Sequence, residues 1–168
     1  MTIIAAGIST VANKDTINER NKQRIIDDFT ELTVLTGNNN DIEGNINTKL
    51  LTFNNETYPQ EHEEYQTALN EYQENFKLIK KHTEGVEENC KRDFEDSRVS
   101  IMCKSYQMLY EEATNNYIET ITNYNNMIKK YNETAATPYS ELEMIEKEYI
   151  DYNQDNVFLG KPEEDNVQ

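Results

Sequence analysis

The sequence is poor in the residues that interrupt regular structure. Its 168 residues include 5 glycines, 3 prolines and no tryptophan. Glycine and proline mark the tight turns of β architectures, so their scarcity argues against a fold of many short strands. Valine and isoleucine also do not gather into the runs that are typical of buried strands. We therefore expect long, uninterrupted helices.

Apolar residues are scarce as well, at 36% of the chain, against roughly 45–50% in an ordinary globular domain. That leaves enough apolar surface for one stripe along each helix rather than for a thick core. No apolar run has the length of a bilayer-spanning helix. The N-terminal run Met1–Val11 lacks basic residues and is interrupted by polar ones, so we expect a mature terminus rather than a signal peptide.

Acidic residues dominate the charge, giving a formal net charge of −16. Residues 1–57 carry −3, residues 58–133 carry −6 and residues 134–168 carry −7. Binding to nucleic-acid phosphates or to an anionic membrane needs a basic surface. We therefore expect no direct nucleic-acid partner and no membrane partner.

Residues that carry chemistry are few: two histidines, His62 and His82, and two cysteines, Cys90 and Cys103. Neither histidine has a cysteine or a second histidine at metal-ligand spacing, and the sequence has no glycine-rich phosphate loop. The acidic clusters are typical of solvated surface. We expect no catalytic residue, no cofactor and no metal site, and so a protein that is not an enzyme.

The two cysteines lie thirteen residues apart. On one continuous helix they would sit on opposite faces and about 20 Å apart along the axis, beyond the reach of a disulfide. This predicts reduced thiols, which suit a nuclear or cytoplasmic protein rather than a secreted one.

The N-terminal third divides into an arm and one or two helical segments. Residues 1–14 are expected to be a flexible arm. Residues 15–57 are expected to be helical, starting at the capping box formed by Thr16 and Glu19. The run 37–40, a glycine followed by three asparagines, predicts a helix end, with a weaker helix after it.

Residues 58–133 form a long helical region with heptad periodicity, which Pro59 opens in its first turn. Apolar side chains recur there at alternating spacings of three and four, in two seams. We interpret these seams as partner-binding faces of coiled-coil helices. Their residues are Tyr65, Leu69, Tyr72, Phe76, Ile79 and Val86 in the first seam, and Met102, Tyr106, Leu109, Tyr117, Ile121, Tyr124, Ile128 and Tyr131 in the second.

Between the seams, residues 91–97 are charged and lose the heptad phase. Because no glycine or proline marks a turn there, we favour one continuous helix over a hairpin near residues 93–97. After Pro138, a capping box at Ser140 predicts a short helix over 138–152. Residues 153–168 are expected to be a disordered acidic tail. The fold class is therefore all-α: long helices in a coiled-coil or elongated helical-bundle assembly.

Part of the chain resembles a known family. The segment 81–90 ends a helix in Asn-Cys, the tyrosine-spaced helix 117–131 follows, and Thr-Pro-Tyr-Ser interrupts it at 137–140. This order is similar to the N-terminal coiled-coil region of the synaptonemal complex central element protein that is named for the strand opposite a Six-class homeobox gene. The resemblance implies a nuclear scaffold that binds other central element coiled coils during meiotic chromosome synapsis.

Two other functions fit the pattern. One is a coiled-coil subunit of another complex, such as a kinetochore, tethering or cytoskeletal assembly. The other is a self-contained helical bundle that binds a small ligand, which would require a hairpin near residues 93–97. The oligomeric state, the pairing direction and the role of the apolar patch 157–159 stay open.

Overall fold

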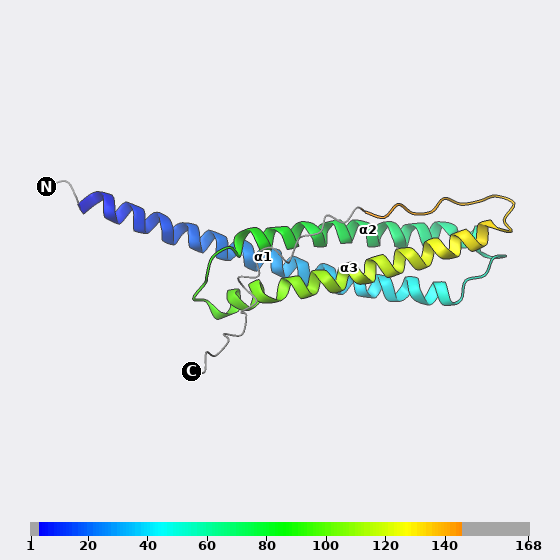
Figure 1. Cartoon of the computed structure of the whole chain (residues 1–168), viewed down its shortest axis with the longest axis horizontal. Coiled ribbons are helices and arrows are strands. Elements are labelled where there is room, and N and C mark those ends of the chain that lie inside the picture. Colours follow the sequence, from blue (N-terminus) through cyan, green and yellow to red (C-terminus); the bar gives the residue numbers. More distant parts are fainter. Residues whose placement is uncertain (1–3, 146–168) are drawn as a thin grey trace, which may run out of the picture.

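The computed structural model describes residues 4–145, with side chains from Lys14 onward, and shows an all-α fold. Helix α1 spans Ile4–Leu51, α2 spans Tyr58–Asn89 and α3 spans Ser97–Asn132. The described residues contain no strand. The chain runs up, down and up through an elongated bundle, and α1 projects beyond the other two helices at its N-terminal end (Figure 1). The prediction of an all-α fold is confirmed.

Helix α1 is longer and more regular than the sequence predicted. The predicted arm is helical from Ile4, and α1 runs without interruption through residues 37–40 to Leu51. Both expectations were therefore wrong. The reason is tertiary packing: the buried positions of α1 stay in phase on both sides of Gly37, so continuing the helix buries Ile46 in the same core as Ile25 and Leu32.

Helix α2 begins as predicted. Pro59 lies in its first turn, where the missing N–H has no helical partner to lose. The connection from α1 is short, and Tyr58 is fully buried at its end.

The chain reverses direction between α2 and α3, so the expected continuous helix was wrong and the hairpin alternative is confirmed. Asp96 starts the new helix: its side chain accepts hydrogen bonds from the N–H groups of Arg98 (3.0 Å) and Val99 (3.3 Å). An N-cap of this kind satisfies N–H groups that the first turn leaves unpaired.

The hairpin brings the two cysteines together. Cys90 and Cys103 form a disulfide with a Cα–Cα distance of 5.6 Å, within the usual range for such bonds. The expectation of reduced thiols was wrong because it placed both residues on one straight helix.

Residues 133–145 leave the end of α3 and run back along the outside of the bundle (Figure 1). The predicted helix over 138–152 is wrong for 138–145, which are not helical. Residues 146–152, the acidic tail and the patch 157–159 lie outside the described residues. We call the segment 139–145 the strap.

No helix among the described residues is both long and apolar enough to cross a membrane.

Candidate functional site

The predicted seam residues face one another inside the single chain. Thirteen of the fourteen are buried, and Phe76 stacks on Tyr117 with ring centroids 4.1 Å apart. Leu109 is the exception: it is partly buried, and the neighbouring Tyr110 takes the core position. A partner that used these seams would have to replace contacts that the chain makes with itself. Their role in partner binding stays a prediction.

Tyr58 and the seam residue Tyr124 belong to a cluster of hydroxyl hydrogen bonds at one end of the bundle. The Tyr58 hydroxyl lies 2.6 Å from that of Tyr124 and 2.8 Å from Nδ1 of His62. The side-chain amide of Gln66 donates to the Tyr124 hydroxyl at 2.7 Å. Burial raises the pKa of the Tyr58 and Tyr124 hydroxyls, so both stay protonated and can donate. The cluster thus buries large aromatic area without leaving its hydroxyls unpaired.

The strap lies against this aromatic cluster. The ring of Tyr139 stacks on His62 at 4.0 Å, and its centroid lies 5.4 Å from that of Tyr58 and 5.7 Å from that of Tyr131. Burial lowers the pKa of His62, which favours the neutral ring in this stack. Tyr139 is therefore the aromatic anchor of the strap.

Two asparagines of α3 hold the main chain of the strap. Asn132 donates to the carbonyl of Tyr139 (2.7 Å) and accepts from its N–H (2.9 Å). Asn125 does the same for Leu142, with both bonds at 2.9 Å. Each amide thus pairs with the donor and the acceptor of one strap residue.

Further hydrogen bonds continue along the strap. The N–H of Ile145 donates to the Tyr117 hydroxyl at 3.3 Å. Gln73 of α2 donates to the Glu143 carbonyl at 3.0 Å and to the same Tyr117 hydroxyl at 3.2 Å. The strap therefore occupies a groove whose walls come from both α2 and α3, and whose polar groups contact its main chain.

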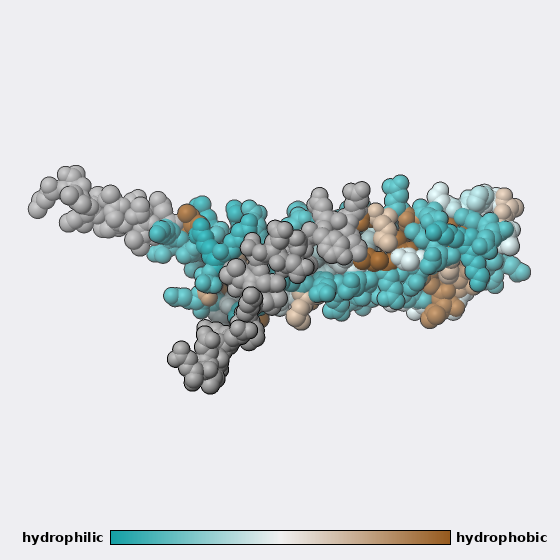
Figure 2. All heavy atoms as spheres, in the orientation of Figure 1, coloured by the Kyte–Doolittle hydropathy of each residue, from teal (hydrophilic) through white to brown (hydrophobic). Residues whose placement is uncertain are grey.

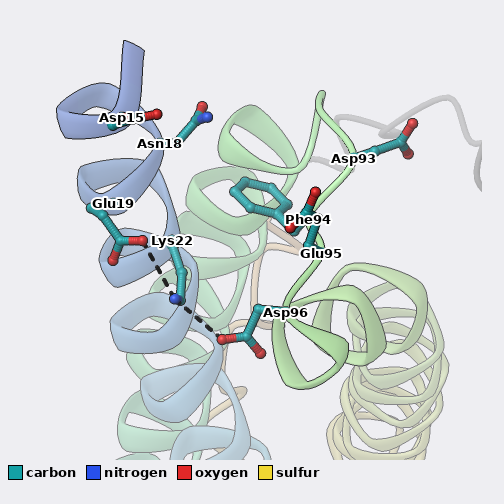
Figure 3. A pocket seen from close by; sticks show the side chains of 8 residues that line it. All are labelled: Asp15, Asn18, Glu19, Lys22, Asp93, Phe94, Glu95 and Asp96. Atoms are coloured by element: carbon teal, nitrogen blue, oxygen red, sulfur yellow. Dashed lines mark ion pairs between the residues drawn. The ribbon is translucent and has the colours of Figure 1, made fainter. Parts of the chain in front are cut away.

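A cleft of about 470 Å³ opens where α1 passes the hairpin, lined by Asp15, Asn18, Glu19, Lys22, Asp93, Phe94, Glu95 and Asp96 (Figure 3). Lys22 reaches across it to the Asp96 carboxylate (3.2 Å) and also pairs with Glu19 on its own helix (3.5 Å) (Figure 3). The N–H groups of α3 and the Lys22 ammonium together hold the pKa of the Asp96 carboxyl below its usual value. The hydrogen bond to Asp96 in turn raises the pKa of Lys22. The ion pair between Lys22 and Asp96 therefore joins the hairpin to α1.

Helices α1 and α2 approach closely at Gly85, against which the Asp28 carboxylate packs. Asp28 also pairs with Nδ1 of His82 at 2.8 Å. A side chain at position 85 would displace this carboxylate, so the glycine makes room for the contact between Asp28 and His82. Both histidines thus have packing partners, and no group of three metal-ligating side chains occurs among the residues with described side chains.

Most of the visible surface is hydrophilic, with small separate apolar groups (Figure 2). The exposed large apolar side chains are Ile17, Val34, Leu51, Leu78, Ile101, Met108 and Met144. The strap and the two asparagines that hold it were not predicted from the sequence. The signal that could have found them is their spacing of one heptad on α3, on the flank of the seam.

Comparisons with protein-family models, with curated proteins and with solved structures find no match to this chain.

Proposed function

We propose that the chain is a structural helical subunit that assembles with partner helices through the projecting N-terminal part of α1. The observation that carries this proposal is the excess length of α1, 48 residues against 32 in α2 and 36 in α3. At 1.5 Å per residue, α1 is about 72 Å long and α2 about 48 Å. Side chains 14–20 are all exposed, and the core begins at Ile25.

The helical state of this projecting part has little stability without a partner that covers it, because short helices without tertiary contacts are only weakly stable in water. Ile17 is 43% exposed on it, and the preceding sequence carries further apolar residues at positions 4, 8 and 11. A second helix that packs against the projecting part of α1 would cover Ile17, which the bundle leaves exposed.

The resemblance to the synaptonemal complex family supports a meiotic version of this proposal, with central element coiled coils as partners and a nuclear location. A subunit of a kinetochore, tethering or cytoskeletal complex would use the same surface. The disulfide weighs towards an oxidising compartment, so the oxidation state of Cys90 and Cys103 in cells bears directly on the location.

The test compares two substitutions of equally exposed side chains. Ile17→Glu places a charge on the projecting helix, and Leu78→Glu places one on α2, where the native residue is 42% exposed. We expect Ile17→Glu to abolish self-association or partner capture in analytical ultracentrifugation and pull-down, with Leu78→Glu unaffected. Equal behaviour of both variants would refute the role of α1.

A self-contained bundle that binds a small ligand is the second candidate. The hairpin that it requires is present, and the cleft beside Lys22 offers one place for a ligand. A compact monomer at all concentrations in the same ultracentrifugation experiment would favour it over assembly.

A further inference from the structure

The helices hold the strap largely through its main chain rather than through its side chains. Four of its hydrogen bonds join the strap main chain to the side chains of Asn125 and Asn132: each amide donates to a strap C=O and accepts from a strap N–H. Every amino acid except proline supplies both groups. The groove therefore recognises an extended backbone, and it does so largely independently of side-chain identity.

The spacing of the two asparagines fits an extended chain. Seven residues on α3 advance about 10.5 Å along the helix axis. Three residues of an extended chain, the separation of Tyr139 and Leu142, advance about 10 Å. One heptad of α3 therefore matches three residues of the strap, which runs antiparallel to the helix. This match lets both amides bond without distorting either element.

Side-chain selectivity comes from three anchors, at every third position. Tyr139, Leu142 and Ile145 are partly buried against the core, and the intervening strap residues are exposed. Lys129 adds a surface contact to Glu141 at 3.5 Å, which contributes little energy on its own. The groove thus fits an aromatic residue followed by aliphatic residues three and six positions later.

The strap can leave while the three helices stay packed, because none of its residues is fully buried. Beneath it, Tyr117, Tyr124 and Ile128 belong to the core that the three helices form with one another. The connection to α3 is exposed at Ala136 and Thr137. Segments with few buried contacts open with a fraction of the global unfolding free energy.

From this geometry we infer that the α2–α3 groove is a docking site for an extended segment of another protein. That segment carries an aromatic residue, then aliphatic residues at the third and sixth following positions. The strap is its resident occupant, and a partner segment binds by displacing it. Docking in this groove is separate from the proposed assembly through α1, because the two use different surfaces. An experiment can therefore refute one proposal and leave the other standing.

The test uses the full chain with Tyr139→Ser and Leu142→Ser, which weaken the strap in cis and leave the groove intact. The probe is a fluorescein-labelled peptide of residues 136–145, followed by anisotropy. We expect saturable binding that is at least tenfold tighter than to the wild-type chain, whose groove is occupied. Adding Asn125→Ala and Asn132→Ala should reduce binding at least tenfold. Circular dichroism confirms that the helices persist.

Main-chain recognition is tested on the peptide itself. Methylation of the backbone nitrogen of Leu142 removes the N–H that donates to Oδ1 of Asn125 and should abolish binding. The matched control carries the methyl group on the nitrogen of Met144, an exposed residue, and should still bind. Equal affinity of the two peptides would overturn the inference.

A second measurement does not depend on strap variants. A protease site inserted between Ala136 and Thr137 cuts the otherwise native chain after folding. We expect the cut segment to stay bound and to exchange with excess labelled peptide. A segment that never exchanges, or chains that swap straps into dimers without binding the peptide, would overturn the docking site.

Discussion

The disulfide between Cys90 and Cys103 should be a main source of stability at the hairpin. The bond closes a loop with a sequence separation of 13. Such a loop restricts the unfolded chain, and the loop-entropy relation gives about 3 kcal/mol for a closed loop of this length. For a chain of this size, each kcal/mol corresponds to about 2–4 °C in Tm, so losing the bond should lower Tm by about 6–12 °C.

The perturbation is the double substitution Cys90→Ala and Cys103→Ala, followed by urea unfolding with circular dichroism as the signal. Both cysteine side chains are buried, and alanine avoids leaving an unpaired polar atom in the core. Reduced wild-type protein is the matched control, because it keeps the sulfur atoms and loses only the covalent bond. We expect both samples to unfold at lower urea with helix content unchanged in the native state.

The result that would refute this reasoning is an unfolding midpoint that reductant does not change. Titration of free thiols in denatured, unreduced protein gives an independent check. We expect no free thiol, because the described fold places the cysteine pair at bonding distance.

Three further substitutions test local features by thermal unfolding. Gly44→Ala should raise stability by about 0.5–1 kcal/mol, since nothing lies within 4 Å of the added methyl group; a loss would show that α1 is not helical there. Gly85→Ala should not raise stability, because the added Cβ would lie 2.7 Å from Cγ of the Asp28 carboxylate. The double variant Gly85→Ala with Asp28→Ala removes this contact and should recover the gain. Burial raises the pKa of Glu43 above its ordinary value of 4.5, so its ionised form destabilises the fold at neutral pH; Glu43→Gln should raise Tm at pH 7, with the difference vanishing as the pH falls below the unfolded-state pKa.

Much of the helical core could be predicted from the sequence because heptad spacing reflects burial directly. Tyr65, Leu69 and Tyr72 are buried as the pattern predicts. The core takes Tyr110 in place of Leu109, a shift of one residue. From Leu109 to Ile121 the seam has three successive spacings of four, at residues 109, 113, 117 and 121, and such an interruption of the heptad repeat makes its phase ambiguous.

The hairpin was missed because its signals are not the usual turn residues. The loop 91–96 contains no glycine or proline, and its marks are the loss of apolar phase and the capping residue Asp96. A carboxylate followed by a serine is common on helix surfaces, so it predicts a helix start only weakly. The pairing of Cys90 with Cys103 follows from the turn and could not be predicted without it.

The helix through residues 37–40 and the strap were missed for the opposite reason, because local signals there are overruled by distant contacts. Asn39 is buried against α2, with its amide 3.4 Å from the Tyr72 carbonyl. Ser140 fits a capping box, yet Asn125 and Asn132 hold its neighbours in an extended form. Tertiary hydrogen bonds that satisfy the same backbone groups override the local preference for a helix or a helix end.

The central claim is that the two seams pack against each other within one chain, and a distance measurement tests it most directly. Spin labels are attached through noncanonical amino acids at the exposed positions Lys77 and Asn115, so the native cysteines stay intact. Dilution with unlabelled protein suppresses distances between chains. The hairpin predicts a label separation on the order of 20 Å, because packed helix axes lie about 8–10 Å apart and the labels extend outward. A distance near 57 Å, the value for about 38 residues of one continuous helix, would contradict it.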